Sequence, residues 1–430
     1  MEYKRMKGNY KKRIADKMLS EQLEAAGVVL VQGPKWCGKT TTAQQAAASS
    51  LFMDNPASIK ANLMISETNP EMILEGKTPR LIDEWQLAPS LWDAARFEVS
   101  RRGLPGQFIF TGSSVPADAS MITHSGTGRF AWLTMRPMSL QESEDSTASV
   151  SLGSLFKTGR AAGIGADIDI MRLAFLLCRG GWPGSLQLSD RASLLQADNY
   201  VDAVVNSDIS RVDGIARNSV FTSKLLRSYA RYQGAQVSLT KIADDILAAG
   251  SNNFSLDTLY DYVNSLKKIF VIEDMEAWSP NLRSKTAIRT SDTRYFTDPS
   301  IATSAMGVGP DDLVGDLNTM GLVFETMAVR DLRVYAEALG GKVFHYRDKN
   351  GLECDAVIHL RNGKYGLTEV KLGGESLVES GAKTLKALAA KIDTDKMEAP
   401  SFMMVLTGVG KYAYTRDDGV VVVPIAALGV

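Results

Sequence analysis

Residues 33–40 read GPKWCGKT, and this stretch decides the fold of the first third of the chain. It matches the pattern Gly-x-x-x-x-Gly-Lys-Ser/Thr, in which a glycine-rich loop cradles phosphate groups. The apolar run VVLVQ at 28–32 precedes the loop, and the helix-forming run TTTAQQAAA follows it. A loop of this kind lies between a strand and a helix, so that the helix N-terminus points at the anion. The stretch therefore predicts a nucleotide site of the P-loop class.

Each loop position has an expected role toward ATP and Mg²⁺. Glycine at both ends lets the backbone curl until its N–H groups face the phosphates, Lys39 reaches the β- and γ-phosphates, and Thr40 holds Mg²⁺. Cys37 has two interpretations: a thiolate favoured by the adjacent helix N-terminus, or a small packed thiol facing the sheet. The residues expected to bind the nucleotide are Gly33, Pro34, Lys35, Trp36, Cys37, Gly38, Lys39, Thr40 and Thr41.

A second acidic motif follows in PRLIDEWQ at 79–86. Asp83 ends an apolar strand, where it would bind Mg²⁺, usually through water. Glu84 beside it would polarise the attacking water as a general base. The alternative is that the two acids cap a helix before Trp85. A predicted strand at 50–53 places an extra strand between the two motifs, the arrangement of ATPases that carry an adjacent catalytic glutamate.

Two further stretches supply candidate catalytic residues. In FIFTGSS at 108–114, Thr111 and Ser113 stand at a strand end and could hold the attacking water, although a plain strand-to-loop turn explains them equally well. In HSGTGRF at 124–130, Arg129 could reach a γ-phosphate in its own subunit or in a neighbour. The alternative is a solvated loop arginine.

Composition restricts the class of protein. The 430 residues include 45% apolar and 23% charged residues, which is typical of a soluble globular chain. No apolar run reaches the roughly 18–20 residues that cross a bilayer, and the basic N-terminus lacks the apolar stretch of a signal peptide, so we expect a cytoplasmic protein and no membrane partner. Three cysteines and three histidines are scattered, which argues against a disulfide framework or a structural zinc site.

The pattern of apolar runs divides the chain into an α/β unit, a linker, a helical region and a second α/β unit. Short apolar runs alternating with helices over 1–140 predict a parallel sheet with crossovers. The stretch QESEDSTASVSLGSLFKTGRAAGIGAD is polar and rich in small residues, so we expect a linker over 141–167. Residues 168–310 are expected to be mainly helical, and residues 318–430 return to an α/β pattern with helices at 320–339 and 376–392.

Within the helical region, two segments open with a serine N-cap. They are SLTKIADDI at 238–246 and SLDTLYDYVNSLKKIFVIEDM at 255–275. Two helices followed by the start of a wing would make a winged-helix module. An ordinary helical packing domain is equally compatible, because helix-turn-helix spacing is permissive.

The four elements of the nucleotide site, followed by WLTMRPMSLQE at 132–142, resemble the AAA-like ATPases of bacteria and archaea. In that family an N-terminal AAA domain precedes a C-terminal region of unknown function. The resemblance extends along nearly the whole chain and implies an AAA-type ATPase with a winged-helix-like middle region and no defined substrate. The later landmarks are RGGWPGSL at 179–186, NYVDAVVNSDISRV at 199–212, RYFTDPSIA at 294–302 and GLVFETMAV at 321–329.

A second constellation lies in the C-terminal region. Asp355 begins one predicted strand, and Glu369 and Lys371 stand two apart on the next, so that their side chains share a face. This spacing resembles the restriction-endonuclease-like nucleases, in which the acids hold Mg²⁺ or Mn²⁺ and the lysine activates water. Glu325 on the preceding helix could complete the oxygen ligands. The alternatives are a domain that keeps the fold without cleavage and a structural ion-pair cluster.

From the sequence we expect ATP hydrolysis by an AAA-like module, coupled to conformational change in the C-terminal domains. One alternative is a metal-dependent nuclease that processes nucleic acid under the control of ATP. Another is a nucleotide-gated binding protein with little turnover. The partners considered are ATP, DNA or a protein reached through the C-terminal domains, and further copies of the chain in a homo-oligomer.

Overall fold

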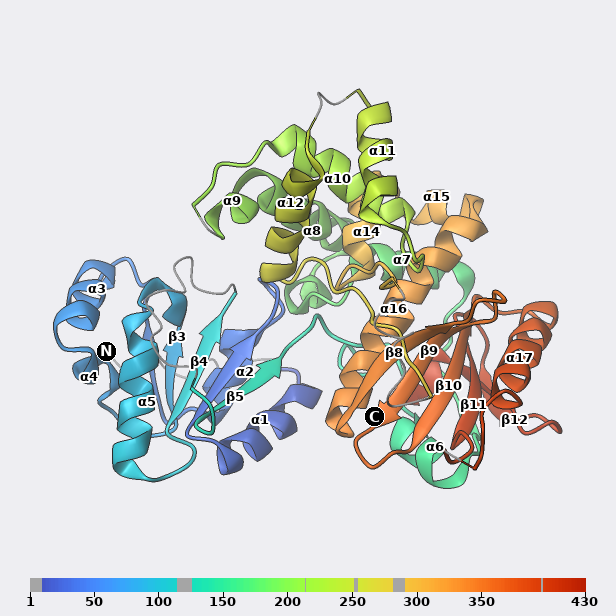
Figure 1. Cartoon of the computed structure of the whole chain (residues 1–430), viewed down its shortest axis with the longest axis horizontal. Helices are drawn as coiled ribbons and strands as arrows, with labels where there is room; N and C mark the ends of the chain where they lie inside the picture. Colours follow the sequence, from blue (N-terminus) through green and yellow to red (C-terminus); the bar gives the residue numbers. More distant parts are fainter. Residues whose placement is uncertain (1–9, 114–125, 213, 251–253, 281–290, 396) are drawn as a thin grey trace. The chain divides into compact units, whose positions relative to one another are not determined.

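The computed structural model forms two compact units, and neither is a single stretch of chain (Figure 1). The N-terminal unit comprises Met1–Pro137, Asn206–Arg217 and Asn264–Phe270. The C-terminal unit comprises Met138–Val205, Asn218–Val263 and Val271–Val430. Within these units the structure describes residues 10–113, 126–212, 214–250, 254–280, 291–395 and 397–430.

The N-terminal unit is built on a five-stranded, all-parallel sheet in the order β2-β3-β4-β1-β5. This confirms the predicted parallel sheet. Strand β4, rather than the strand predicted at 50–53, lies between the strands that lead into the two motifs; the latter strand forms the outer edge. The strands are β1 Val28–Gln32, β2 Ser49–Phe52, β3 Arg80–Asp83, β4 Phe108–Gly112 and β5 Phe130–Thr134.

Helices cover both faces of this sheet, because its inner strands are apolar on both sides. Val28 and Leu30 of β1 contribute to a core that includes Trp85 and Leu91, whereas Val29 contributes to a second core with residues of α1 and α2. Fully burying one such side chain stabilises the fold by about 1.5–3 kcal/mol. The helices are α1 Ile14–Ala25, α2 Lys39–Ala46, α3 Ile59–Thr68, α4 Pro70–Leu74, the 3₁₀ turn η1 Trp85–Leu87, and α5 Ser90–Arg102.

The middle of the chain is mainly helical, as predicted. Ser238 accepts a hydrogen bond from the backbone N–H of Lys241, so it caps its helix as expected. After α12, two antiparallel bridges join Ile272 to Phe296 and Met275 to Thr293. The elements are α7 Ile170–Arg179, η3 Pro183–Gln187, α8 Asp190–Ala203, the π-helical turn η4 Val204–Asp208, α9 Ile209–Arg211, α10 Ser219–Arg231, α11 Leu239–Ala248, α12 Leu256–Lys268, α14 Pro299–Met306 and α15 Pro310–Gly315.

A seven-stranded mixed sheet in the order β7-β12-β13-β11-β10-β9-β8 forms the α/β part of the C-terminal unit. The long helix α16, Leu317–Ala338, contacts β8, β9 and β10, and α17, Glu375–Ala389, packs on β9, β10 and β11 (Figure 1). The strands are β7 Gly163–Ile164, β8 Gly341–Arg347, β9 Glu353–Leu360, β10 Tyr365–Lys371, β11 Phe402–Thr407, β12 Tyr412–Thr415 and β13 Val421–Pro424.

The segment 141–167, which we expected to be a polar linker, forms part of the C-terminal unit instead. Its β6, Val150–Ser151, pairs with β14, Leu428–Gly429, and its β7 extends the seven-stranded sheet beyond β12. Between them, α6, Leu152–Thr158, buries three apolar side chains. The prediction was wrong because it rested on the average polarity of the segment. That average does not reveal the three apolar side chains, and it does not indicate that the backbone pairs with β12 and β14.

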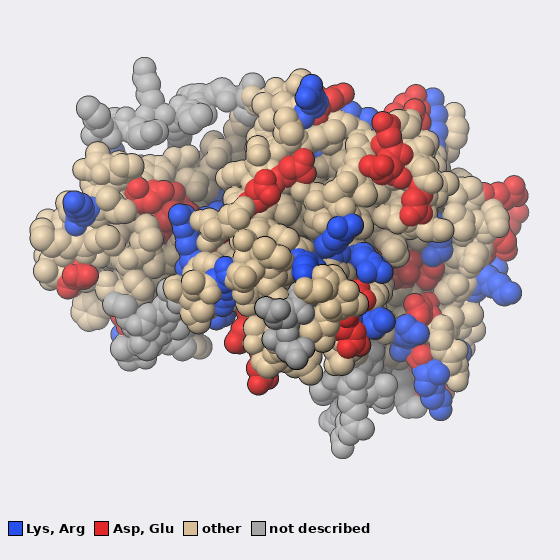
Figure 2. Space-filling view, turned by 90° about the horizontal axis from the view of Figure 1, so that it is seen from above, with Lys and Arg blue, Asp and Glu red and all other residues tan. Residues whose placement is uncertain are grey.

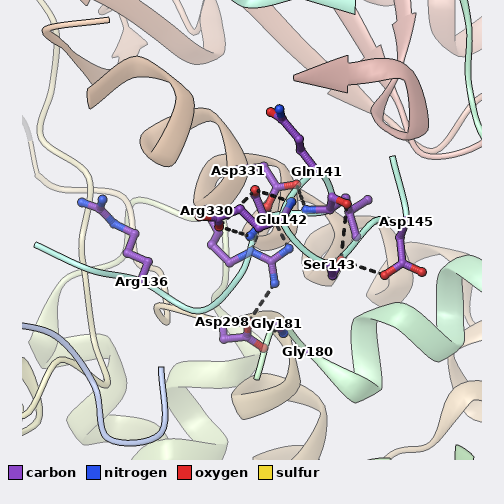
Figure 3. A network of polar contacts seen from close by, with 12 residues as sticks. Arg136, Gln141, Glu142, Ser143, Asp145, Gly180, Gly181, Asp298, Arg330 and Asp331 are labelled. Atoms are coloured by element: carbon purple, nitrogen blue, oxygen red, sulfur yellow. Dashed lines mark hydrogen bonds and ion pairs between the residues drawn. The ribbon is translucent and has the colours of Figure 1, made fainter. Parts of the chain in front are cut away.

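A buried charged network lies within the C-terminal unit (Figure 3). The guanidinium of Arg330 on α16 donates to Asp298 Oδ2 at 2.8 Å and to Asp331 Oδ1 at 2.9 Å. All three side chains are at most 1% exposed. Burial raises the pKa of Asp331 to about 6, against the opposing effect of the Arg330 charge.

The two carboxylates also hold distant backbone segments. Asp331 Oδ2 accepts from the backbone N–H of Leu140 at 2.9 Å, and Asp298 Oδ2 accepts from that of Gly181 at 3.0 Å. Three of the stretches singled out in the sequence, 132–142, 179–186 and 294–302, therefore contain residues of one network, and a fourth, 321–329, ends directly before Arg330. None of the helices that the structure describes is long and apolar enough to cross a membrane.

Candidate nucleotide-binding site

The predicted phosphate loop has the backbone that its glycines allow. Gly33 has φ 151° and Gly38 has φ 99°, both in the region that disfavours other residues. A Cβ added to Gly33 would stand 2.0 Å from the carbonyl oxygen of Met135, so no side chain fits there. Helix α2 begins at Lys39, directly after the loop. The loop and the helix N-terminus thus form the type of cradle in which backbone N–H groups bind phosphate.

Lys39 is buried within this loop. Its ammonium group donates to the carbonyl oxygens of Gly33 at 2.9 Å and Pro34 at 2.8 Å. The side chain is folded back on the loop, and its residue is only 6% exposed. A positive charge is therefore fixed at the position where the pattern requires one.

Thr40 and Asp83 meet where the two motif strands end. The Thr40 hydroxyl donates to Asp83 Oδ1 at 2.7 Å, and the hydroxyl of Thr111 donates to the same oxygen. Burial raises the pKa of Asp83, while these two hydrogen bonds oppose the rise. A threonine hydroxyl and a carboxylate are oxygen ligands of the kind that Mg²⁺ takes, so the residues present fit a magnesium ion bound with ATP.

Glu84 follows Asp83 with a left-handed backbone, φ 54°. One of its carboxylate oxygens, Oε2, accepts from the side-chain amide of Gln86, and the Ser113 hydroxyl lies 3.5 Å from the same oxygen. Burial raises the pKa of Glu84, the Gln86 hydrogen bond lowers it, and the charge of Asp83 raises it. Thr111 and Ser113 thus each contact one of the two acids.

Arg129 lies at the opposite edge of the sheet. Its carbonyl oxygen accepts from the N–H of Val28 at 3.0 Å, and its Nε donates to the Ser100 hydroxyl at 2.6 Å. The phosphate loop follows the other end of β1, five residues away along the strand, or roughly 15 Å at the usual rise per residue. The structure therefore does not bring Arg129 together with the loop of its own chain. His124 and Ser125 of the same stretch lie outside the described residues.

Two residues that sequence reasoning did not single out contact the loop. Asp208, in the π-helical turn η4, forms an ion pair with Lys35 at 2.6 Å. Arg13, ahead of α1, donates to the carbonyl oxygens of Cys37 at 2.6 Å and Arg136 at 2.8 Å. Asp208 stands in the quoted stretch NYVDAVVNSDISRV, but nothing in its spacing indicates a partner 173 positions earlier.

The remaining loop positions differ in exposure. Cys37 is fully buried in the core shared by β1, α1 and α2, and its thiol lies 3.5 Å from the carbonyl oxygen of Met135. This agrees with the packed-thiol alternative. Trp36 is 46% exposed at φ 65°, and Thr41 is exposed on α2.

The C-terminal constellation comes together around a lysine. Lys371 lies 2.7 Å from Glu369 Oε2 and 3.3 Å from Asp355 Oδ2, and Asp355 Oδ2 also accepts from the backbone N–H of Val370 at 2.7 Å. Burial and the charge of Asp355 raise the pKa of Glu369 to about 7. Glu325 on α16 accepts from the Tyr295 hydroxyl.

This arrangement does not fit a metal ion. In the part of the chain that the structure describes, no three His, Cys, Asp or Glu side chains gather in a way that could hold one. The Lys371 ammonium already serves as the cation between Asp355 and Glu369. The geometry is that of an ion-pair cluster on neighbouring strands.

Three family models match successive parts of the chain. Residues 25–144 match an AAA domain, residues 171–312 match a domain of unknown function, DUF8612, and residues 320–428 match a second one, DUF4143. The AAA match spans β1 to β5, and so contains both acidic and phosphate-binding motifs. The AAA match agrees with the candidate nucleotide site described above, and the names of the other two models specify no activity.

The chain is also distantly similar to two curated proteins and to two solved structures. Uncharacterized proteins of Mycobacterium bovis and Mycobacterium tuberculosis are each 22% identical over 420 residues, 96% of this chain and 83% of theirs. A Walker-type ATPase of Pyrococcus abyssi is 14% identical with a TM-score of 0.41, over 71% of this chain and 98% of that one. An Aeropyrum pernix ORC1 protein solved in complex with DNA is 12% identical with a TM-score of 0.25, over 72% and 95%. Residues 25–144 are thus similar to AAA domains and contain a loop with the geometry of the P-loop class, and residues 320–428 are similar to DUF4143 domains.

Proposed function

We propose that the chain binds ATP with Mg²⁺ and hydrolyses it in the N-terminal unit. The observation that carries the proposal is the hydrogen bond between Thr40 and Asp83, because it joins the phosphate loop to the acidic motif at one edge of the sheet. Glu84 follows directly, half-buried and with a raised pKa, as suits a general base. Binding, metal coordination and proton abstraction would then share one edge.

Each residue has a separable role in this proposal. Lys39 and the loop N–H groups bind the β- and γ-phosphates, and Thr40 with Asp83 would hold Mg²⁺, which draws charge from the transferred phosphoryl group. Glu84 takes the proton of the attacking water. Thr111 orients the Asp83 carboxylate through its hydroxyl group, and Ser113 lies beside Glu84.

Two variants of the full chain test the proposal. Lys39→Ala should lose ATP binding, whereas Glu84→Gln should bind ATP with unchanged affinity and turn over at least ~100-fold more slowly, the range that removal of a general base costs. Glu67→Gln, an exposed glutamate on α3, is the matched control and should match the wild type. Wild-type turnover in Glu84→Gln would refute the assignment of the base, and tight ATP binding by Lys39→Ala would refute the site.

We propose further that the helical part of the C-terminal unit is a winged-helix-like module and that nucleotide turnover changes its conformation. Support comes from the sequence of α10, α11 and α12, followed by the antiparallel bridges at Ile272 and Met275. Hydrogen exchange of α10–α12 with and without Mg-ATP tests the coupling, and identical exchange in both states would refute it.

An ATP-regulated nuclease has no comparable support. The Asp355 cluster is closed by Lys371, as described above. On the face seen in Figure 2, basic and acidic side chains occur in small interspersed groups and do not form a broad basic surface for nucleic acid. The net charge of −1 gives no general attraction to it either.

A further inference from the structure

In the turn that follows the acidic motif, the side chain of Gln86 bends back toward Glu84. Glu84 adopts a left-handed backbone, and the 3₁₀ turn η1 begins at the next residue. Two residues later, Gln86 Nε2 donates to Glu84 Oε2. The expected general base is thus held by an amide from its own turn, and among the described residues the side-chain contacts of Glu84 are to Oε2.

Chemistry fixes the orientation of this amide. An amide turned the other way would set its oxygen against a carboxylate oxygen, and neither atom could donate. In the orientation observed, Gln86 Oε1 is buried and has no hydrogen-bond partner among the described residues. An unpaired buried acceptor costs about 1–3 kcal/mol, so the turn gives up one hydrogen bond while it keeps the bond to Glu84.

The end of strand β4 leaves room for the amide. Gly112 is the last residue of β4, directly after Thr111. A Cβ added to Gly112 would lie 2.6 Å from Gln86 Oε1 and 3.2 Å from Trp85 Nε1. The absence of a side chain at Gly112 therefore allows the oxygen of the Gln86 amide to pack against the strand, while the nitrogen of the same amide donates to Glu84.

We infer that Gln86 is a positioning residue for the hydrolysis of ATP: it holds Glu84 through Oε2 so that Oε1 is presented for proton abstraction. This role rests on the proposed function. A base oriented by a third group is the general arrangement of activated catalytic sites. Ser113, at 3.5 Å from the same oxygen, is too distant to replace the amide.

The role predicts a loss of turnover without a loss of binding. Gln86→Met keeps the length of the side chain and removes the donor. We expect its kcat to fall between about 10- and 100-fold, part of the contribution that a general base makes, while KM and the ATP dissociation constant stay within about twofold. Gly112→Ala should reproduce the effect by displacing the amide. Gln187→Met, at an exposed position of η3, is the matched control and should match the wild type.

A double variant separates positioning from structural damage. If Gln86 acts only through Glu84, then Glu84→Gln/Gln86→Met should turn over no more slowly than Glu84→Gln alone. A multiplied loss in the double variant, a loss of ATP affinity in Gln86→Met, or turnover at or above the wild-type rate in Gln86→Met would each overturn the role. In these cases an active wild type would leave the proposed function intact. A wild type that hydrolyses no ATP would overturn both.

Discussion

Replacing Arg330 by methionine tests the energetic role of the network in the C-terminal unit. The change keeps much of the apolar stem and removes the guanidinium between Asp298 and Asp331, whose side chains are 0% exposed. Removing one partner of a buried ion pair leaves an uncompensated buried charge and costs about 3–5 kcal/mol. That is a large fraction of the 5–15 kcal/mol by which most domains are stable.

The cost should depend on pH, because the pKa of Asp331 is raised to about 6 in the folded protein. A carboxyl group whose folded pKa exceeds its unfolded value holds an extra proton in the folded state, so the free energy of unfolding falls as pH rises between the two values. For the wild type this decrease in the free energy of unfolding ends near pH 6. Without Arg330 the pKa of Asp331 rises further, so the variant continues to lose stability above pH 6. The difference between parent and variant should therefore be larger at pH 8 than at pH 5.5.

Hydrogen exchange read peptide by peptide is the appropriate assay, because a chain of two units need not unfold in one transition. Peptides that contain Leu140 and Gly181 report directly, since their N–H groups donate to the two carboxylates. Arg231→Met is the matched control: Arg231 pairs with Asp245 at 3.2 Å, its side chain is 62% exposed, and the change should cost at most about 1 kcal/mol. A loss below about 1 kcal/mol in Arg330→Met, or the same loss at both pH values, would refute the reasoning.

Three further outcomes follow from the sites. If Arg129 serves a neighbouring subunit, Arg129→Ala should retain ATP affinity and lose most turnover, and excess Lys39→Ala subunits should restore part of it; failure at every mixing ratio would leave Arg129 a surface residue. Cys37, buried behind the loop, should resist alkylation in the native protein; rapid modification that Mg-ATP blocks would contradict the packed position. Asp355→Asn should lower the melting temperature of the full chain, and neither protein should show Mn²⁺ heat in calorimetry; a Mn²⁺ signal that the substitution abolishes would revive the metal site.

The geometry of the candidate nucleotide site was largely predictable because its parts are local or are set by strand ends. The loop from Gly33 to Thr40 is one continuous motif, and Asp83 ends a strand of the same parallel sheet, so both must lie at one edge. Four of the five strands of the first sheet were predicted to within one or two positions for the same reason: buried parallel strands are continuous apolar runs. The fifth, β5 at Phe130–Thr134, was not predicted. The order of these strands in the sheet was less evident, because the order of strands along the chain does not show that β4 lies between β1 and β3.

Contacts between distant segments were not predictable from pattern. Lys35 and Asp208 are 173 positions apart, and Leu140 and Asp331 are 191 apart. No periodicity links such pairs. From sequence alone, a single charged residue is interpreted as a solvated surface residue. The prediction of a linker over 141–167 was wrong for a related reason. The segment is polar, but its position in the fold is set by hydrogen bonds to strands that lie more than 240 residues later in the chain.

The pairing of β7 with β12 and of β6 with β14 has a consequence for synthesis and for truncation. During translation, residues 150–164 leave the ribosome long before the strands that they join, so the C-terminal unit cannot close until residue 429 is made. A fragment that begins after this stretch, at residue 168 or at residue 318, would lack both partners and would expose the free edge of β12, where Tyr412 and Tyr414 already face outward. Open edges of this kind invite pairing with other chains. The domain boundary suggested by the polar stretch is thus the wrong place to cut this protein.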